Sequence, residues 1–319
     1  MMGDINGTKM NKTVSELTAE VYDKIAREYS QHATSNYLDM VQWIPIECIL
    51  DDLIGPDRRD KKFLLVGIGD MRQHLRQMLD LEDSRQKLKL DDANNVIDRK
   101  NITLFDISPN ILNTNATKMS SYGRSVLGDA SYLGAYFPEG SFDFVLGFLC
   151  DHIADQDGFF EGAYKILKEH GVLMTTYPGK ELQYAIRKGI YNIDVNMTRF
   201  QLNGKQYFLP SKLYTLKELY EFYKRKGFGD VSVSGWCGDD GDDLIIDEKV
   251  TPTILQGYKI IGKSTKTTNI VTMGIGGKGG ILNCSRPNYE HWRHWLVDCL
   301  YDTQTDSTCY YKRVDGLKI

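Results

Sequence analysis

Short apolar runs alternate with longer amphipathic stretches through the middle of the chain. Residues 63–66 are four consecutive apolar residues, and further segments with strand character occur at 101–107, 124–129, 142–149 and 171–178. A short apolar run bounded by turn residues is typical of a strand covered on both faces. Stretches with helical spacing separate these segments, at 72–81, 108–122 and 155–170. The alternation predicts an α/β fold, with a mostly parallel sheet and helices on both faces.

The N-terminal region has a different pattern. We expect residues 1–12 to be disordered, and an amphipathic helix to begin at Thr13 or Ser15, because apolar residues follow at helical spacing. A second helical stretch, 37–55, is interrupted by Pro45. The chain therefore reaches the first strand through N-terminal helices.

Four later segments stand out by composition. Residues 82–100 are strongly polar and are predicted to be a surface insertion. The segment 179–213 is predicted to form a helix and then a hairpin that turns at Asn203 and Gly204. The glycine-rich stretch 274–280 is predicted to be a flexible or tight-turning loop, and 288–302 a helix with Trp292 and Trp295 on one face.

Composition changes this picture little. The chain has 319 residues, 41% hydrophobic and 26% charged, with a formal net charge of -4. This balance gives no general attraction to nucleic acid or to an anionic membrane. No apolar stretch approaches the roughly 20 residues that a membrane-spanning helix needs, and the first residues lack the apolar core of a signal peptide. We expect a cytoplasmic protein that binds neither membrane nor nucleic acid.

The six cysteines are scattered without a CxxC pair, which favours free thiols in a reducing compartment. Cys150 is predicted to be a buried small apolar residue rather than a nucleophile. The tail brings together Cys284, His291, His294, Cys299 and Cys309, but only the two histidines have spacing close to that of zinc ligands. We therefore predict no metal site.

The residues that follow each predicted strand carry the candidate chemistry. Ligands of such sheets bind at the carboxyl ends of the strands, where strand order reverses. The strand-end residues are Gly67, Ile68, Gly69 and Asp70, then Asp106, then Gly128, Asp129 and Ala130, and finally 148–152. A glycine turn brings backbone amides to a ligand, and an acid at the end of the next strand accepts hydrogen bonds from ribose hydroxyls. Together with an Asp beside a main-chain amide, which can read the edge of an adenine, these residues predict an adenosine site.

Two common adenosine cofactors do not fit the glycine turn. A dinucleotide fingerprint needs a third glycine three positions after Gly69, where Arg72 stands. A phosphate-binding loop of the GxxxxGK[ST] type does not occur in the chain, and the 274–280 stretch lacks its serine or threonine. The adenosine site is therefore not predicted to bind a dinucleotide or a nucleoside triphosphate.

The order of these motifs resembles the class I S-adenosylmethionine-dependent methyltransferases of the small-molecule type. The resemblance runs from about Lys61 to Lys263 and is carried by six segments: LLVGIGD, LFDISPNIL, GDA, FDFVLGFLCDHIAD, AYKILKEHGVLMTTYP and LYTLKELYEFYKRKGFGDVSVSG. The stretch 253–264 resembles the closing antiparallel strand of the family. The resemblance implies a doubly wound, mostly parallel seven-stranded sheet of Rossmann-like methyltransferase type, with N-terminal helices and a C-terminal extension.

The resemblance also implies S-adenosyl-L-methionine as cofactor and a division of the chain. The implied parts are a helical lid at 13–60, a cofactor-binding domain at 61–264 that includes an acceptor-site insertion at 179–213, and a C-terminal extension at 265–319. The implied cofactor-binding residues are Gly67, Ile68, Gly69, Asp106, Ile107, Asp129, Ala130 and Phe148. The C-terminal extension is expected to pack on the sheet, with a homodimer contact as the alternative.

Two positions depart from the family pattern. The third glycine of the glycine motif is replaced by Met71, and the acid that commonly precedes the first glycine by two positions is replaced by Leu65. These departures leave open an alternative, a methyltransferase-like fold without catalysis that acts as a binding or regulatory partner.

Methyl transfer requires alignment of the acceptor, and a base only where the acceptor arrives protonated. His152 is the leading candidate for that base, because it follows the fourth strand at the sheet edge. Tyr22 and Tyr29 lie on the N-terminal helix, in a stretch that resembles the lid helix of the family, and are candidates for closing the site; core packing is the alternative for both. The predicted function is S-adenosylmethionine-dependent methylation of oxygen, nitrogen or carbon in a small-molecule acceptor.

Overall fold

The computed structural model describes residues 12–32, 53–54, 58–69, 97–116, 123–184, 187–188, 192–202, 205–238, 269–279 and 311–313. Several predicted segments lie outside these residues. They are most of 37–55, the helix 72–81, most of the polar segment 82–100, the strand 253–264, and the C-terminal helix 288–302 with the nearby cysteines and histidines.

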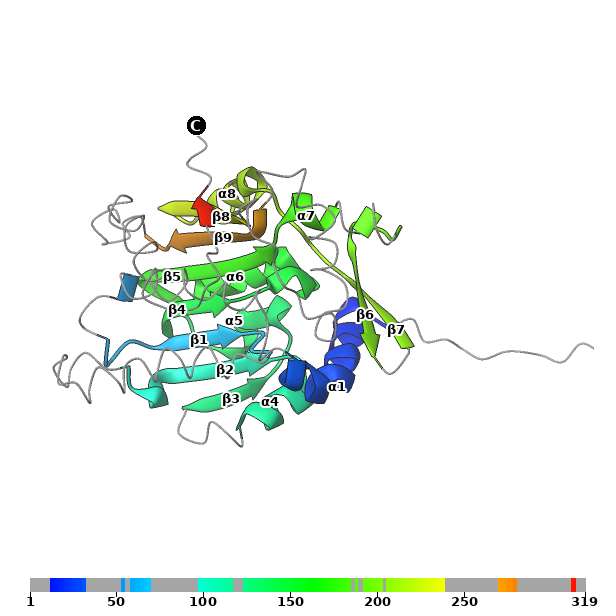
Figure 1. Cartoon of the computed structure of the whole chain (residues 1–319). Helices are drawn as coiled ribbons and strands as arrows, with labels where there is room; N and C mark the ends of the chain where they lie inside the picture. The colour runs from blue at the N-terminus through cyan, green and yellow to red at the C-terminus, as the bar shows by residue number, and fades with distance from the viewer. Residues whose placement is uncertain are drawn as a thin grey trace, which may run out of the picture.

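Five parallel strands form the centre and one side of the main sheet (Figure 1). They are β1 (Phe63–Val66), β2 (Ile102–Asp106), β3 (Arg124–Leu127), β4 (Phe142–Gly147) and β5 (Leu167–Pro178). The order of strands is β10-β8-β9-β5-β4-β1-β2-β3, and β1 pairs in parallel with both β2 and β4. Strand order therefore reverses beside β1, and the carboxyl ends of β1, β2 and β4 meet at the point where such sheets bind ligands.

The other side of the sheet is antiparallel. Strand β9 (Asn269–Gly277) runs between β5 and β8 (Val231–Gly238), antiparallel to both, and the short β10 (Tyr311–Arg313) pairs with β8. The predicted doubly wound, mostly parallel sheet of seven strands is confirmed, and β10 adds an eighth strand at the edge. The closing antiparallel strand is β9, which follows the segment where the sequence pattern placed it.

The loop predicted at 274–280 is wrong for its first four residues, which belong to β9. Tyr223 of α8 (Leu216–Arg225) lies against this strand. A Cβ atom at Gly274 would come within 2.4 Å of the Tyr223 ring, and one at Gly276 within 2.5 Å of it. Tyr223 Oη also donates a hydrogen bond to the Gly274 carbonyl at 2.8 Å. These glycines let helix α8 approach strand β9 closely. In the sequence alone, glycines with this packing role look the same as glycines that mark a turn.

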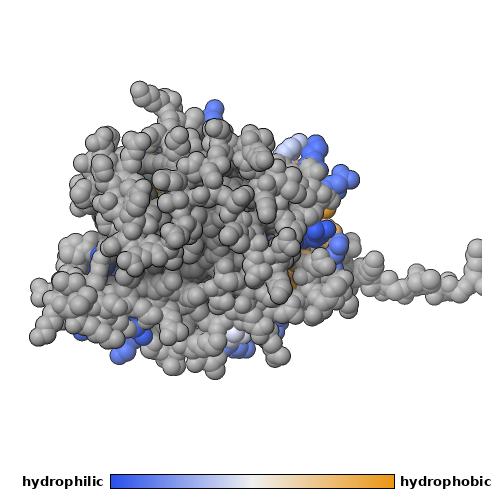
Figure 2. Space-filling model, viewed as in Figure 1, coloured by the Kyte–Doolittle hydropathy of each residue, from blue (hydrophilic) through white to orange (hydrophobic). Residues whose placement is uncertain are grey.

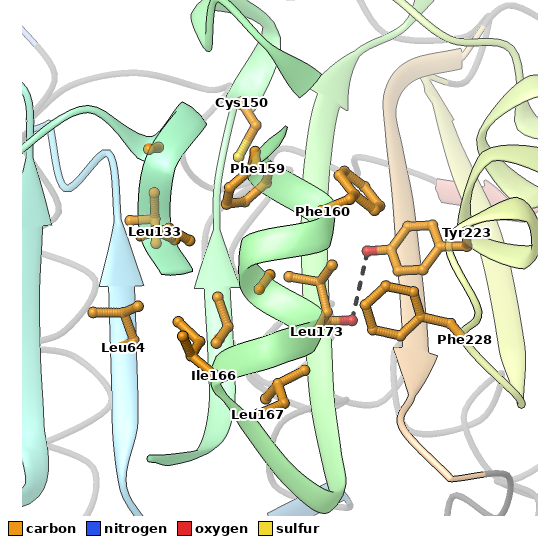
Figure 3. Close-up of a cluster of buried hydrophobic side chains, with 14 of the residues drawn as sticks. Leu64, Leu133, Cys150, Phe159, Phe160, Ile166, Leu167, Leu173, Tyr223 and Phe228 are labelled. Atoms are coloured by element: carbon orange, nitrogen blue, oxygen red, sulfur yellow. Dashed lines mark hydrogen bonds between the residues drawn. The ribbon is translucent and has the colours of Figure 1, made fainter. Parts of the chain in front are cut away.

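Helices α5 (Leu133–Tyr136), α6 (Gln156–Ile166) and α8 contribute to one buried cluster with β1, β4 and β5. Figure 3 shows Phe159 and Phe160 of α6 in this cluster, with Leu133 on one side and Tyr223 on the other. Each ring that is fully buried in this way contributes about 1.5–3 kcal/mol to folding. The predicted helix 155–170 ends at Ile166, because the chain enters β5 directly at the next residue.

Two elements outside the main sheet stand over its carboxyl edge. They are helix α1 (Val14–His32) and a hairpin of β6 (Met197–Leu202) and β7 (Lys205–Pro210), which follows the short helix α7 (Lys180–Tyr184). Leu202 pairs with Lys205, so the predicted two-residue hairpin connection is confirmed. Figure 1 shows α1 beside this hairpin, at one end of the sheet.

The contact between α1 and the hairpin is apolar. Val21, Ile25 and Leu209 are buried there, with Tyr22 and Phe200 packed against them. In Figure 2 the described residues visible on this face are mainly hydrophilic, and the few apolar ones lie on the side where α1 and the hairpin stand. None of the helices in the described part of the chain has the length and apolar character to cross a membrane.

Replacing Gly276 by Ala is expected to lower the free energy of unfolding by about 1–3 kcal/mol, because the new methyl group would displace the Tyr223 ring. Urea unfolding measures this change. Gly134→Ala is the matched control, since its Cβ would meet only the flexible Lys165 side chain, at 3.4 Å, and a Gly162 backbone atom, at 3.7 Å. The control is expected to stay within about 0.5 kcal/mol of wild type. A Gly276→Ala protein as stable as wild type would contradict this account of β9.

Candidate active site

The glycine turn follows β1 directly. Gly67 and Gly69 have positive φ angles of 64° and 43°, a backbone conformation that favours glycine. The amide of Gly67 donates to the Phe105 carbonyl at 2.9 Å, which ties the turn to the end of β2. Within the described part of the chain, no atom outside the immediate chain neighbours lies within 4 Å of the position that a Gly67 Cβ would occupy, whereas the Ile68 side chain is buried. The turn thus presents open space beside its backbone.

Asp106 is the last residue of β2, and its side chain is only 5% exposed. Its Oδ1 accepts a hydrogen bond from the Ser108 amide at 2.9 Å, and the amides of Ile68, Gly69 and Ile107 also hydrogen-bond to the carboxylate. Burial raises the pKa of Asp106 from 3.8 to about 6, and the four backbone hydrogen bonds oppose that rise. The structure therefore brings the predicted acid directly against the predicted glycine turn.

The turn after β3 lies next to Asp106. The Gly128 amide donates to the Asp106 carbonyl at 3.0 Å. Asp129 Oδ1 accepts from the Ser131 amide at 2.9 Å and so caps the 3-10 helix η3 (Ala130–Tyr132). Ala130 is buried in this cap. Asp129 and Ala130 therefore stand at the same sheet edge as the predicted ribose-binding acid.

The chain turns sharply after β4. Phe148 is buried, and Leu149 adopts a left-handed conformation with φ 52°. The Leu149 amide donates to Thr176 Oγ1 at 2.9 Å, which anchors the turn on β5. The 3-10 helix η4 (Cys150–His152) follows. Burial raises the pKa of the Cys150 thiol, in agreement with an inert apolar role for this residue.

His152 is nearly buried, with an exposure of 9%. Its Nδ1 lies 2.8 Å from the Pro210 carbonyl oxygen, and its Nε2 lies 3.4 Å from Asp151 Oδ2. The rings of Tyr22 and Phe200 have their centroids 6.0 and 5.6 Å from that of His152, and 6.0 Å from each other. Of the three predicted catalytic residues, the structure brings Tyr22 and His152 together. Tyr29 lies on α1, but its side chain is outside the described part of the structure.

Helix α1 is tied to the start of α4 by Asp23, a carboxylate that was not predicted from the sequence. Asp23 Oδ1 accepts from Ser108 Oγ at 2.6 Å and from the Asn110 amide at 3.0 Å, at the start of α4 (Pro109–Ala116). The amide of the same Ser108 donates to Asp106. One buried serine therefore connects helix α1 to the end of β2. The motif DISPN, with a serine just before the proline that opens a helix, is the signal from which this cap could have been recognised.

Three further residues lie beside His152. Asp151, Arg187 and Ser211 are buried and joined by hydrogen bonds. Asp151 lies in the predicted strand-end stretch 148–152, and Arg187 and Ser211 lie in the predicted acceptor-site insertion 179–213, but their contacts with one another arise only in the fold. Within the described residues, no three His, Cys, Asp or Glu side chains are grouped in a way that could hold a metal ion.

The fold defines a doubly wound α/β protein with its candidate site at the carboxyl ends of the parallel strands. Residues 88–175 match the model of a methyltransferase domain family, a stretch that begins after the glycine turn and includes β2, β3 and β4. No curated protein matches the sequence. The matched model is that of a methyltransferase domain, and it supports the resemblance to class I S-adenosylmethionine-dependent methyltransferases that the order of the motifs indicates.

Solved structures share the fold at low sequence identity. One is a chain of the complex between the Haloferax volcanii Trm112 methyltransferase activator and a candidate methyltransferase, with 16% identity, a TM-score of 0.51, and coverage of 82% of this chain and 98% of that chain. Another is the DhpI–SAM–HEP complex, with 15% identity, a TM-score of 0.50, and coverage of 82% and 96%. These similarities support the methyltransferase-type architecture of the sheet.

The buried carboxyl of Asp106 is expected to make stability depend on pH. Its pKa in the folded protein, about 6, lies above the ordinary value of 3.8, so between these values the folded state binds more protons than the unfolded state. The contribution of this group to stability therefore falls as pH rises through about 6, by roughly 3 kcal/mol in total. Urea unfolding of wild type and Asp106→Asn between about pH 4 and 7 tests this. As pH rises over this range, wild type is expected to lose about this much unfolding free energy relative to the variant. If the unfolding free energies of wild type and variant differ by the same amount at every pH, the raised pKa of Asp106 is contradicted.

Proposed function

We propose that the chain binds S-adenosyl-L-methionine at the ends of β1, β2 and β3 and transfers its methyl group to a small-molecule acceptor. The observation that carries the proposal is the position of Asp106, a buried carboxylate bound by the amides of the glycine turn. An ionised carboxylate is an acceptor of hydrogen bonds only, which suits the two hydroxyls of a ribose. The backbone of Gly67 stands beside open space, which suits the polar tail of the cofactor.

The adenine ring of the cofactor is proposed to bind at the turn after β3. Asp129 and the Ala130 amide follow β3, next to Asp106, and can pair with the amino group and a ring nitrogen of an adenine. Ile68, Ile107 and Phe148 supply apolar surface around the nucleoside. The departure at Leu65 does not remove these groups, since Leu65 is buried within β1. Met71 lies outside the described residues.

Bound S-adenosylmethionine supplies a methyl group activated by a sulfonium, whose sulfur keeps the electron pair of the broken bond. The protein then has to hold the acceptor in line with that methyl group, and such alignment can lower a barrier by about 7–11 kcal/mol. The end of β4, the lid helix α1 and the β6–β7 hairpin surround the position from which an acceptor would approach. Tyr22 closes this position from α1, and Phe200 closes it from β6.

His152 is proposed as the general base. Because the Pro210 carbonyl can only accept, Nδ1 of His152 carries the proton of the neutral ring, and Nε2 keeps a lone pair. That nitrogen can take the proton of an O–H or N–H acceptor as the acceptor attacks. The adjacent Asp151 carboxylate, 3.4 Å away, then faces the new N–H.

The close packing of aromatic rings around His152 supports a small acceptor. The Tyr22 and Phe200 rings pack on the imidazole, so a group that reaches Nε2 has to fit between α1 and the hairpin. A large polymer would need both elements to move away. The net charge of -4 also provides no general attraction to a nucleic acid.

Titration calorimetry with S-adenosylmethionine tests the cofactor assignment. Wild type is expected to bind, and Asp106→Ala to bind about 10- to 100-fold more weakly, because hydrogen bonds to a charged group contribute about 1.5–3 kcal/mol. Asp157→Ala is the control and should keep wild-type affinity, since Asp157 is an exposed carboxylate on α6 that pairs with Lys226. Absence of binding by wild type at millimolar cofactor would favour the alternative of a non-catalytic binding protein.

Acceptor-dependent formation of S-adenosylhomocysteine tests the base. With a panel of small phenols and amines, His152→Gln is expected to lower the rate about 10²- to 10⁴-fold while the cofactor affinity stays within a few fold of wild type. A rate within about threefold of wild type would show that the acceptor does not depend on this base. Cofactor binding without product formation from any acceptor would instead indicate another use of the cofactor.

A further inference from the structure

We propose that Asp151 is a positioning residue for His152, and that Ser211 and Arg187 hold it in place through a buried chain of hydrogen bonds. The inference rests on the proposed function, in which His152 accepts a proton. It assigns roles to Asp151, Arg187 and Ser211, and to the junction between β7 and η4.

The direction of the hydrogen bonds follows from the chemistry of the groups. Arg187 Nη2 lies 3.1 Å from Ser211 Oγ, and a guanidinium can only donate. The hydroxyl of Ser211 accepts from Arg187, and its own proton points to Asp151 Oδ2, 2.6 Å away. The ionised carboxylate of Asp151 is thus the end point of a one-way chain, and it lies 3.4 Å from His152 Nε2.

Three consecutive residues at the end of β7 and just after it bond to two consecutive residues of η4. The Pro210 carbonyl accepts from His152 Nδ1, Ser211 Oγ donates to the Asp151 side chain, and the Lys212 amide donates to the Asp151 carbonyl at 2.7 Å. The β6–β7 hairpin, which is proposed to cover the acceptor, is therefore bonded directly to η4, the element that carries the proposed base His152. Both ring nitrogens of His152 face an acceptor, but the Pro210 carbonyl is closer to Nδ1, at 2.8 Å, than Asp151 Oδ2 is to Nε2, at 3.4 Å, so Nδ1 carries the proton of the neutral ring. A proton taken up at Nε2 would find a carboxylate beside it.

Arg187 is itself fixed from several sides. Its side chain is only 3% exposed. Its other hydrogen bonds go to Gln183 Oε1 at 3.1 Å, Val195 O at 2.8 Å and Thr198 Oγ1 at 2.8 Å. Burial lowers the pKa of Arg187, and the negative charge of Asp151 opposes that change. The cation is thus held between α7 and β6, where it balances the buried carboxylate through Ser211.

Packing alone does not require two buried charges. A buried ion pair is often no more stabilising than apolar residues of the same volume, because both charges lose their water. A carboxylate beside a proton-accepting imidazole has a further effect, since it stabilises the imidazolium that forms when the ring takes up a proton. The buried Asp151 carboxylate is therefore better explained by an effect on His152 during proton transfer than by a contribution to stability.

The closing experiment observes His152 directly by ¹⁵N NMR of the full chain labelled at histidine, with the signals of His152 identified by their loss in His152→Gln. At a pH where the ring is neutral, wild type is expected to carry its proton on Nδ1. A wild-type ring with the proton on Nε2 would overturn the proposal, and this measurement needs no further variant.

Ser211→Ala interrupts the chain between Arg187 and Asp151, whereas Thr198→Val removes another acceptor of the same Arg187 nitrogen and leaves that chain intact. Asp151 Oδ2 accepts from Ser211 and also faces His152 Nε2, so without the Ser211 proton it would accept from an Nε2–H instead. We therefore expect Ser211→Ala to shift the His152 nitrogen signals toward a mixture of tautomers, and Thr198→Val to leave them as in wild type. Unchanged signals in Ser211→Ala, or equal shifts in both variants, would overturn the proposal.

Asp151→Asn tests the charge. Methyl transfer is expected to fall about 10- to 100-fold in kcat, with the affinity for S-adenosylmethionine unchanged within about twofold. A kcat equal to that of wild type would contradict the role of Asp151. Failure of the proposed function has a different signature: wild type would then bind no cofactor, whereas the NMR arm would still report whether the chain sets the tautomer of His152.

Discussion

The carboxylate of Asp106 is held where the ends of β1 and β2 converge, and the candidate site depends on that convergence. Parallel pairing aligns Val66 with Phe105, so the glycine turn and the acid leave the sheet at the same level. Backbone amides from both strand ends then bind the carboxylate. A negative charge buried in this way needs such donors, because its loss of water would otherwise be very costly. The same amide-lined corner, with open space beside Gly67, is what a nucleoside with two adjacent hydroxyls would occupy.

The remaining parts of the site are attached to this corner through a few side chains. Ser108 links Asp106 to Asp23, and so brings helix α1 to the start of α4. Near the end of β4, Ser211 and Pro210 connect the hairpin to η4. The part proposed to bind the cofactor and the part proposed to bind the acceptor are thus held by separate contacts. Tyr22 on α1 is the point at which they meet, since its ring contacts both His152 and Phe200.

Much of the central sheet could be predicted from the sequence, because β1, β2 and most of β4 and β5 are buried on both faces and contain short, mainly apolar runs. Strand β9 could not, because its glycines make room for the Tyr223 ring, and this requirement arises from a helix distant in the chain. The same limit applies to the site. Strand ends are visible as motifs, so Gly67, Asp106 and Asp129 could be found. The Asp23 and Arg187 contacts could not, because nothing near them in sequence identifies their partners.

The central claim is that Asp106 binds the sugar of an adenosine cofactor. A crystal structure of the protein with S-adenosylhomocysteine tests it most directly. The account predicts both ribose hydroxyls within hydrogen-bond distance of the Asp106 carboxylate, about 2.5–3.0 Å, with the amino acid portion of the ligand beside the Gly67 turn. A ribose bound elsewhere on the sheet, with Asp106 still enclosed by backbone amides alone, would contradict it.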